Sequence, residues 1–80
     1  CVCVFDTPDR VQHMFWRYLE ANHPANSGRP CQRSATAIEE LYRRMDDLVG
    51  RTAARLGKGT VLLVISDHGF KSFQRGVNLN

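Results

Sequence analysis

Two short, uninterrupted apolar runs at opposite ends of the chain most constrain how it can fold. Residues 1–5 read Cys-Val-Cys-Val-Phe, and residues 60–66 read Thr-Val-Leu-Leu-Val-Ile-Ser. Short apolar runs rich in β-branched residues are typical of strands that are buried on both faces. Neither approaches the ~18 apolar residues that a membrane span needs. Because helical patterns lie between them, the two runs predict parallel strands of one sheet, joined by a right-handed crossover.

The first helix of that crossover is predicted directly after the first run. Residues 6–9 read Asp-Thr-Pro-Asp, in which Thr7 is a suitable N-cap and Pro8 suits the first helical position. The apolar residues that follow keep helical spacing, and we expect this helix to end at about Ala21. A polar loop rich in proline, glycine and asparagine comes next.

The second helix is predicted over residues 36–56. Thr36 and Glu39 match a capping box, and Gly57 is a natural stop. Gly50 interrupts the apolar stripe, and we interpret it as a position of close approach to a neighbouring element. Three i,i+4 pairs are predicted on its surface: Glu39–Arg43, Glu40–Arg44 and Asp47–Arg51. The order strand, helix, loop, helix, strand predicts an α/β fold with a parallel sheet flanked by helices.

Length and composition limit the classes of protein that remain. The 80 residues are 42% hydrophobic and 24% charged, which is ordinary globular usage and excludes disordered and collagen-like classes. Because the chain begins without Met or a signal-peptide pattern and ends without a helix stop, we expect a piece of a longer protein. The formal net charge is +3, but acids offset the scattered arginines, so no nucleic-acid binding is expected.

The three cysteines do not predict a structural site. An odd number argues against a complete disulfide framework. Cys1 and Cys3 lie two apart in the first apolar run, where they act as small apolar side chains. Together with Cys31 and a histidine they could bind zinc, but their spacing does not match that of zinc fingers.

Four metal-competent side chains follow the two apolar runs. Asp9 and His13 come after the first run, and Asp67 and His68 come directly after the second. The carboxyl ends of parallel strands share one edge of a sheet, which is where open α/β sheets bind ligands. Asp9 and His13 are also one helical turn apart, so a carboxylate and an imidazole can share one cation. The pattern predicts that all four side chains face one crevice.

Each pair also has a purely structural interpretation. Asp9 suits the positive end of a helix and His13 an exposed helix surface, while Asp67 can cap a following segment and His68 can pack. Among other candidates, His23 precedes proline in a polar loop and is predicted to be solvent-exposed. Phe15, Trp16 and Tyr18 are interpreted as aromatics of the core and of a pocket wall. Lys71 and Arg75 are interpreted as exposed loop charges, with contact to a substrate phosphate as the alternative.

Four stretches together resemble the alkaline phosphatase superfamily, and most closely its type I phosphodiesterase/nucleotide pyrophosphatase branch. They are residues 7–18 (TPDRVQHMFWRY), 42–50 (YRRMDDLVG), 64–70 (VISDHGF) and 75–80 (RGVNLN). The resemblance implies a slice of an alkaline-phosphatase-like fold and a two-metal site for phosphoryl transfer. Asp9 and His13 match the pair that binds one ion, and Asp67 and His68 match the pair that helps to bind the other. Nucleotide pyrophosphatases usually have Asp-His-Gly-Met, so Phe70 favours the phosphohydrolase relatives over a nucleotide-specific enzyme.

The resemblance also implies what residues 1–80 lack. The family's serine or threonine nucleophile, its accompanying aspartate and its last histidine ligand have no counterpart here, so these residues form part of a catalytic domain and are expected to be inactive alone. Imidazole and carboxylate ligands together suit zinc, with manganese as the alternative. The implied partner is a small phosphorylated substrate, which a phosphoesterase hydrolyses. A phosphomutase or a non-catalytic interaction domain remains as an alternative function.

Overall fold

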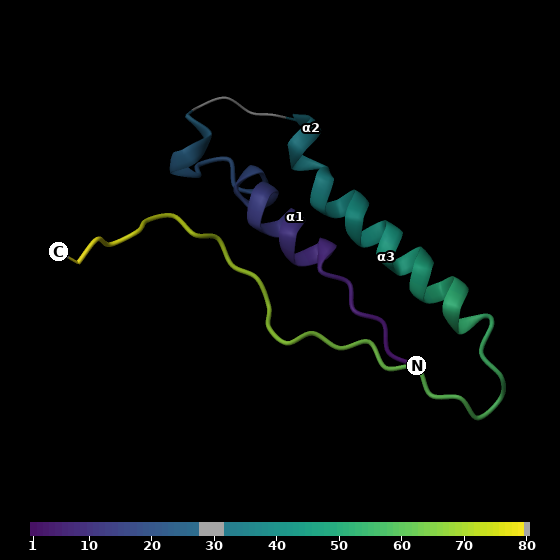
Figure 1. Cartoon of the computed structure of the whole chain (residues 1–80). Coiled ribbons are helices and arrows are strands. Elements are labelled where there is room, and N and C mark those ends of the chain that lie inside the picture. The colour runs from purple at the N-terminus through teal and green to yellow at the C-terminus, as the bar shows by residue number, and fades with distance from the viewer. Residues whose placement is uncertain (28–31, 80) are drawn as a thin grey trace.

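The computed structural model describes residues 1–27 and 32–79. Its elements in chain order are α1 (Thr7–Phe15), the 3-10 helices η1 (Trp16–Leu19) and η2 (Pro24–Asn26), α2 (Gln32–Ala35) and α3 (Ala37–Ala53) (Figure 1). Turns and extended chain make up the rest of the described residues. Within these ranges, no helix combines the length and the apolar character that crossing a membrane requires.

The first predicted helix is present but divides into α1 and η1. Asp6 takes the N-cap position that was predicted for Thr7, so Pro8 is the second helical residue and not the first. The side-chain amide of Asn26 donates to the carbonyl oxygens of Arg17 (2.9 Å) and Glu20 (3.0 Å). These bonds satisfy carbonyls at the end of η1, so the chain turns away before the predicted end at Ala21.

The second predicted helix is α3, which is shorter than residues 36–56 at its C-terminal end. Two of the three predicted ion pairs are present, Glu39–Arg43 (2.6 Å) and Asp47–Arg51 (3.8 Å). The capping box is not formed: the Thr36 side chain makes no cap hydrogen bond and instead donates to the Arg33 carbonyl oxygen (3.2 Å). The reason is that α2 directly precedes α3, so the backbone at Thr36 is already helical.

The small core lies between α1 and α3, which run side by side in opposite directions (Figure 1). Ile38 and Leu41 on α3 are buried. Gln12 on α1 is also buried: its amide donates to the Pro8 carbonyl oxygen (2.9 Å), and its side-chain oxygen accepts from the Tyr42 hydroxyl (3.2 Å). The buried amide is therefore satisfied at both ends, as burial of a polar group requires.

The predicted α/β fold with a parallel sheet is wrong for this chain, since no strand is present among residues 1–27 and 32–79. Residues 1–5 and 60–66 are not helical, but their apolar side chains are largely exposed, with Val2 89% and Ile65 88% accessible. A sheet needs hydrogen-bonded neighbours and covered faces, and two short strands cannot supply both for each other. β-Branched composition therefore did not predict the structure of these two runs, because a strand also depends on partner strands.

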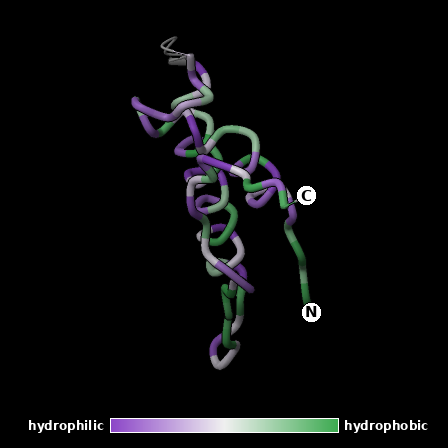
Figure 2. The backbone as a smooth tube through the Cα atoms, turned by 90° about the vertical axis from the view of Figure 1, so that its left-hand side faces the viewer, coloured by the Kyte–Doolittle hydropathy of each residue, from purple (hydrophilic) through white to green (hydrophobic). Residues whose placement is uncertain are grey.

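The molecule is a thin layer. Its principal extents are 54 × 34 × 14 Å, and its radius of gyration is 16.8 Å, against about 12 Å for a globular domain of this length. An α-helix with its side chains is ~10–12 Å across, so the layer is about one helix thick. In Figure 2 the hydrophobic N-terminal residues extend away from the helices.

Gly50 generates a prediction about stability, because its interpretation as a position of close approach is wrong. A Cβ added there has no heavy atom within 4 Å, and the residue lies inside α3. Gly50→Ala should therefore raise the free energy of unfolding by up to about 1 kcal/mol, since alanine is the better helix former. Urea denaturation followed by helical circular dichroism measures the change.

The matched control is Gly59→Ala. Gly59 also has open space around it, but its φ of +89° is a conformation that side chains disfavour. This substitution should lower the free energy of unfolding, because alanine is strained at this φ. A Gly50→Ala variant less stable than the parent would contradict the prediction.

Candidate functional site

Asp9 and His13 lie on the same face of α1, one turn apart. Asp9 is in the first turn and His13 in the last. The Asp9 Oδ1 atom is 3.4 Å from His13 Nε2. The predicted juxtaposition of this carboxylate and imidazole is therefore present, as the i,i+4 spacing of a helix dictates.

The second pair, Asp67 and His68, approaches the same carboxylate from a segment far away in the sequence. His68 Nε2 lies 3.8 Å from Asp9 Oδ1 and 3.8 Å from Asp67 Oδ1. All four predicted residues are thus linked by successive contacts, with Asp9 between the two histidines. The route differs from the predicted one: the chain after residue 66 passes along α1, and the residues that the structure describes form no sheet edge.

The backbone carbonyl of the next residue, Gly69, sets the orientation of the His68 ring. Its Nδ1 atom lies 2.7 Å from the Gly69 carbonyl oxygen, which can only accept a hydrogen bond, so Nδ1 carries the proton. In the neutral ring, Nε2 then presents its lone pair toward Asp9. The Ser66 hydroxyl donates to the His68 carbonyl oxygen (2.5 Å) and further constrains this turn.

These contacts contribute little to stability, because the side chains are open to solvent. The Asp9 side chain is 46% exposed and that of Asp67 is 90% exposed, and ion pairs at such positions contribute ~0–1 kcal/mol. Within the described ranges, no group of three or more His, Cys, Asp or Glu side chains is arranged to hold one metal ion. The arrangement is therefore a set of pairwise contacts around Asp9.

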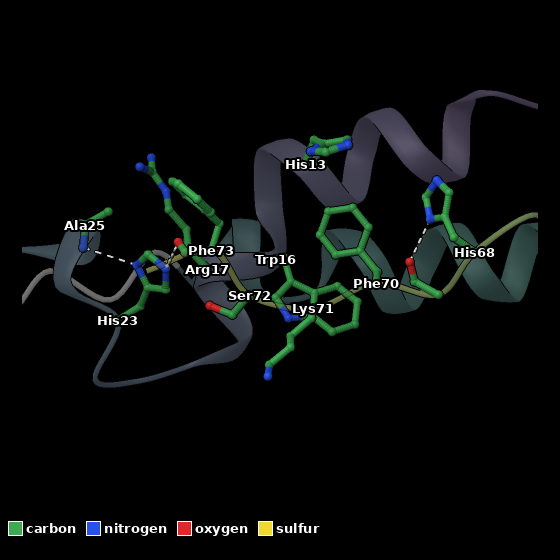
Figure 3. A pocket seen from close by; sticks show the side chains of 11 residues that line it. His13, Trp16, Arg17, His23, Ala25, His68, Phe70, Lys71, Ser72 and Phe73 are labelled. Atoms are coloured by element: carbon green, nitrogen blue, oxygen red, sulfur yellow. Dashed lines mark hydrogen bonds between the residues drawn. The ribbon is translucent and has the colours of Figure 1, made fainter. Parts of the chain in front are cut away.

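A pocket of about 660 Å³ lies beside the two histidines (Figure 3). Its lining residues are His13, Trp16, Arg17, His23, Ala25, His68, Gly69, Phe70, Lys71, Ser72 and Phe73. Phe70 forms the central wall of the pocket. The centroid of its ring lies 4.8 Å from that of His13, which meets it edge-on, and 5.1 Å from that of Trp16. The interpretation of Trp16 as a pocket-wall aromatic is confirmed.

The pocket also presents cations and free hydrogen-bonding atoms. Arg17 and Lys71 line it, and the Arg17 guanidinium donates to the Tyr18 hydroxyl (2.7 Å). The buried atoms Arg17 Nε and Ser72 Oγ have no hydrogen-bond partner within the part of the chain that the structure describes. Both atoms are shielded from solvent, so they are unsatisfied polar groups beside the pocket.

The prediction that His23 is solvent-exposed is wrong. The residue is only 8% exposed and lines the pocket. Its Nδ1 accepts a hydrogen bond from the Ala25 backbone N–H (3.1 Å), and its Nε2 lies 3.0 Å from the Phe73 carbonyl oxygen. The one signal in the sequence was Pro24, because proline at the first helical position marks residue 23 as an N-cap.

The remaining candidates lie outside this cluster or outside the described chain. Cys1 and Cys3 are free and exposed, and Cys31 is not among the described residues. Arg75 is exposed, as is Lys71 at the pocket. Exposure of both cations agrees with their interpretation as loop charges and leaves Lys71 accessible to a ligand.

The surroundings of His68 favour its protonated form. The Gly69 carbonyl that accepts its Nδ1 proton raises the pKa of His68 most, and the Asp67 and Asp9 carboxylates raise it further, while desolvation opposes them. The pKa of His68 is therefore above the ordinary 6.5. The contribution of the protonated ring to stability is complete below the unfolded pKa and is lost as the pH rises through the folded pKa.

An NMR titration of the metal-free protein tests this electrostatic arrangement. The His68 ring should titrate with a midpoint above pH 6.5, and Asp67→Asn should lower that midpoint because it removes a favourable charge. Asp47→Asn, which removes an acid on the surface of α3, is the control and should not change the titration midpoint of His68. A midpoint that Asp67→Asn does not move would contradict the prediction.

Comparison with known protein families identifies the chain. No match to this chain was found among the curated proteins or among the solved structures. A family model described as type I phosphodiesterase/nucleotide pyrophosphatase matches residues 1–80. The match covers both pairs, Asp9 with His13 and Asp67 with His68. The chain belongs to the type I phosphodiesterase/nucleotide pyrophosphatase family, a member of the alkaline phosphatase superfamily.

Proposed function

We propose that this chain supplies four ligands of a two-metal site that hydrolyses phosphate esters. Asp9 and His13 hold one divalent ion, and Asp67 and His68 help to hold the other, with zinc preferred. The family as a whole is generally enzymatic, typically metal-dependent, and acts on phosphorylated substrates. The observation that carries the proposal is the approach of two imidazole Nε2 atoms to one carboxylate oxygen, Asp9 Oδ1.

The separations of the donor atoms suit a shared ion. Two ligands at ~2.0–2.1 Å from a tetrahedral zinc lie about 3.3 Å from each other. Asp9 Oδ1 and His13 Nε2 are 3.4 Å apart. His68 Nε2 lies 3.8 Å from both Asp9 Oδ1 and Asp67 Oδ1, so its assignment to the second ion rests on the resemblance to the family, which pairs it with Asp67. Imidazole and carboxylate together are a donor set that zinc accepts.

The ring of His68 supports the same assignment. Histidine ligands usually donate their other ring N–H to a carbonyl or carboxylate, which fixes the tautomer and the direction of the coordinating nitrogen. The bond between Nδ1 and the Gly69 carbonyl has this form and leaves Nε2 facing Asp9. Solvent exposure of all four side chains leaves them accessible to an ion.

The pocket beside the ligands suits a phosphorylated organic molecule. Its volume of about 660 Å³ falls within the ~300–1,000 Å³ usual for small-molecule sites. Trp16 and Phe70 provide apolar walls, while Lys71 provides a positive charge that attracts an anionic ester.

Bound divalent ions would supply charge neutralisation of the phosphate and activation of the attacking oxygen. Asp9, His13, Asp67 and His68 would hold the ions, and Lys71 at the pocket would attract the anionic substrate. In the overall reaction, a P–O ester bond is broken and water supplies the new oxygen on phosphorus and the proton on the leaving alcohol. The proposal assigns no nucleophile to residues 1–80.

Substitution of one ligand from each pair tests the proposal in the intact protein. His13→Ala and Asp67→Asn should each lower the rate of bis(4-nitrophenyl) phosphate hydrolysis by more than about 100-fold, since loss of even an outer-shell partner costs 10–100-fold. Each variant should also bind less metal. Metal content per protein is measured beside the hydrolysis rate, before and after dialysis against a chelator.

The matched control is Asp6→Asn. Asp6 is an exposed acid immediately before α1 and pairs with Arg10 (3.5 Å), so the substitution removes a neighbouring charge without touching the four ligands. It should leave metal content and hydrolysis close to the parent values. Full metal occupancy and near-normal hydrolysis in both His13→Ala and Asp67→Asn would refute the two-metal assignment.

A further inference from the structure

The loop between η1 and η2 is organised from within. The Asn26 amide closes it by donating to the carbonyl oxygens of Arg17 and Glu20. Backbone hydrogen bonds join His23 N–H to the Glu20 carbonyl (3.1 Å) and Asn26 N–H to the His23 carbonyl (3.0 Å). These bonds fix the backbone on both sides of His23.

His23 uses its two ring nitrogens for two different tasks. Because Nδ1 accepts the Ala25 N–H, the proton of the neutral ring is on Nε2. Nε2 then donates to the carbonyl oxygen of Phe73, a residue far away in the sequence (Figure 3). Beside this bond, the Gln74 amide lies 3.4 Å from the Glu20 carboxylate. Two contacts thus join the loop to the same distant segment.

That segment connects His23 to the ligand cluster. From His68 it continues through Phe70, which packs against His13 and Trp16, to Phe73, where His23 holds it (Figure 3). Between Phe70 and Phe73 lie only Lys71 and Ser72, both of which line the pocket. Release of Phe73 would therefore free the wall of the pocket next to both histidines.

We propose that His23 is a positioning residue: its Nε2–Phe73 hydrogen bond holds residues 70–73 in place and so sets the aromatic wall beside His13 and His68. Its effect on turnover rests on the proposed function, whereas its effect on the segment does not. A residue needed only to cap η2 would require Nδ1 alone. The role in positioning residues 70–73 explains the burial of His23 and the long-range hydrogen bond from Nε2.

Two conservative variants separate the two roles of His23. His23→Asn places an amide oxygen near Nδ1 and keeps the cap of η2, but it cannot reach Phe73. His23→Gln places an amide N–H near Nε2 and keeps the bond to Phe73, but it loses the cap. His23→Ala removes both. The intact protein is used for all variants.

Two readouts do not depend on catalysis or metal. Trypsin cleavage after Lys71 and Arg75, followed by mass spectrometry, reports release of the segment. Trp16 emission, isolated by subtracting the spectrum of a Trp16→Phe variant, reports whether Phe70 remains beside it. His23→Ala and His23→Asn should be cleaved roughly three- to tenfold faster, as expected for loss of one net hydrogen bond, and should shift the emission. His23→Gln should resemble the parent in both.

Hydrolysis of bis(4-nitrophenyl) phosphate completes the test. The value of kcat/KM should fall in the same rank order, lowest for His23→Ala and His23→Asn and retained in His23→Gln. If His23→Asn matches the parent in cleavage and emission, His23 is only a cap and the proposal is wrong. Faster cleavage with unchanged emission and kcat/KM would equally overturn it, because the segment would not be coupled to the pocket. An inactive parent protein would refute the proposed function, while cleavage and emission would still decide the role of His23.

Discussion

The carboxylate of Asp9 joins two segments that are far apart in the sequence, α1 and the turn at residue 68. One of its oxygens contacts an imidazole from the same helix and another from residue 68. The first contact follows from helical spacing alone. The second requires the segment after residue 66 to pass along α1, and everything that holds that segment therefore shapes the site. Weak exposed contacts cannot provide this restraint, so it has to come from packing and buried hydrogen bonds.

Two features provide the restraint. Phe70 packs against rings on α1 and η1, and the backbone at Phe73 accepts a hydrogen bond from the buried His23. The position of His23 depends in turn on the end of η1, where Asn26 caps carbonyls and turns the chain. The early end of the first helix is thus part of the site: a helix that continued to Ala21 would leave no loop from which His23 could reach Phe73.

Local patterns predicted the parts of this arrangement that depend on neighbouring residues. The i,i+4 contact of Asp9 with His13, the two helices and two surface ion pairs all follow from spacing along one helix. The proximity of the Asp67–His68 pair to Asp9 was expected, but through the edge of a parallel sheet, and residues 1–27 and 32–79 contain no strand. β-Branched composition reports a preference for extended backbone, whereas a sheet also depends on partner strands that composition does not reveal.

The sequence patterns did not predict the long-range hydrogen bonds. His23 in a polar loop gives no sign that its ring will be buried against residue 73, and the aromatic wall of the pocket depends on that contact. Gly50 shows the reverse error, because a glycine within an apolar stripe suggested a neighbour where the structure has open space. Both errors concern contacts between segments, which local periodicity does not encode.

The thinness of the molecule has a thermodynamic consequence. A layer 14 Å deep has almost no interior, and few side chains leave water when it forms. The heat-capacity increment of unfolding scales with the apolar surface that becomes exposed, and so does the dependence of stability on denaturant concentration. For these 80 residues both quantities should be small per residue, so that melting is gradual and local opening is almost as easy as complete unfolding.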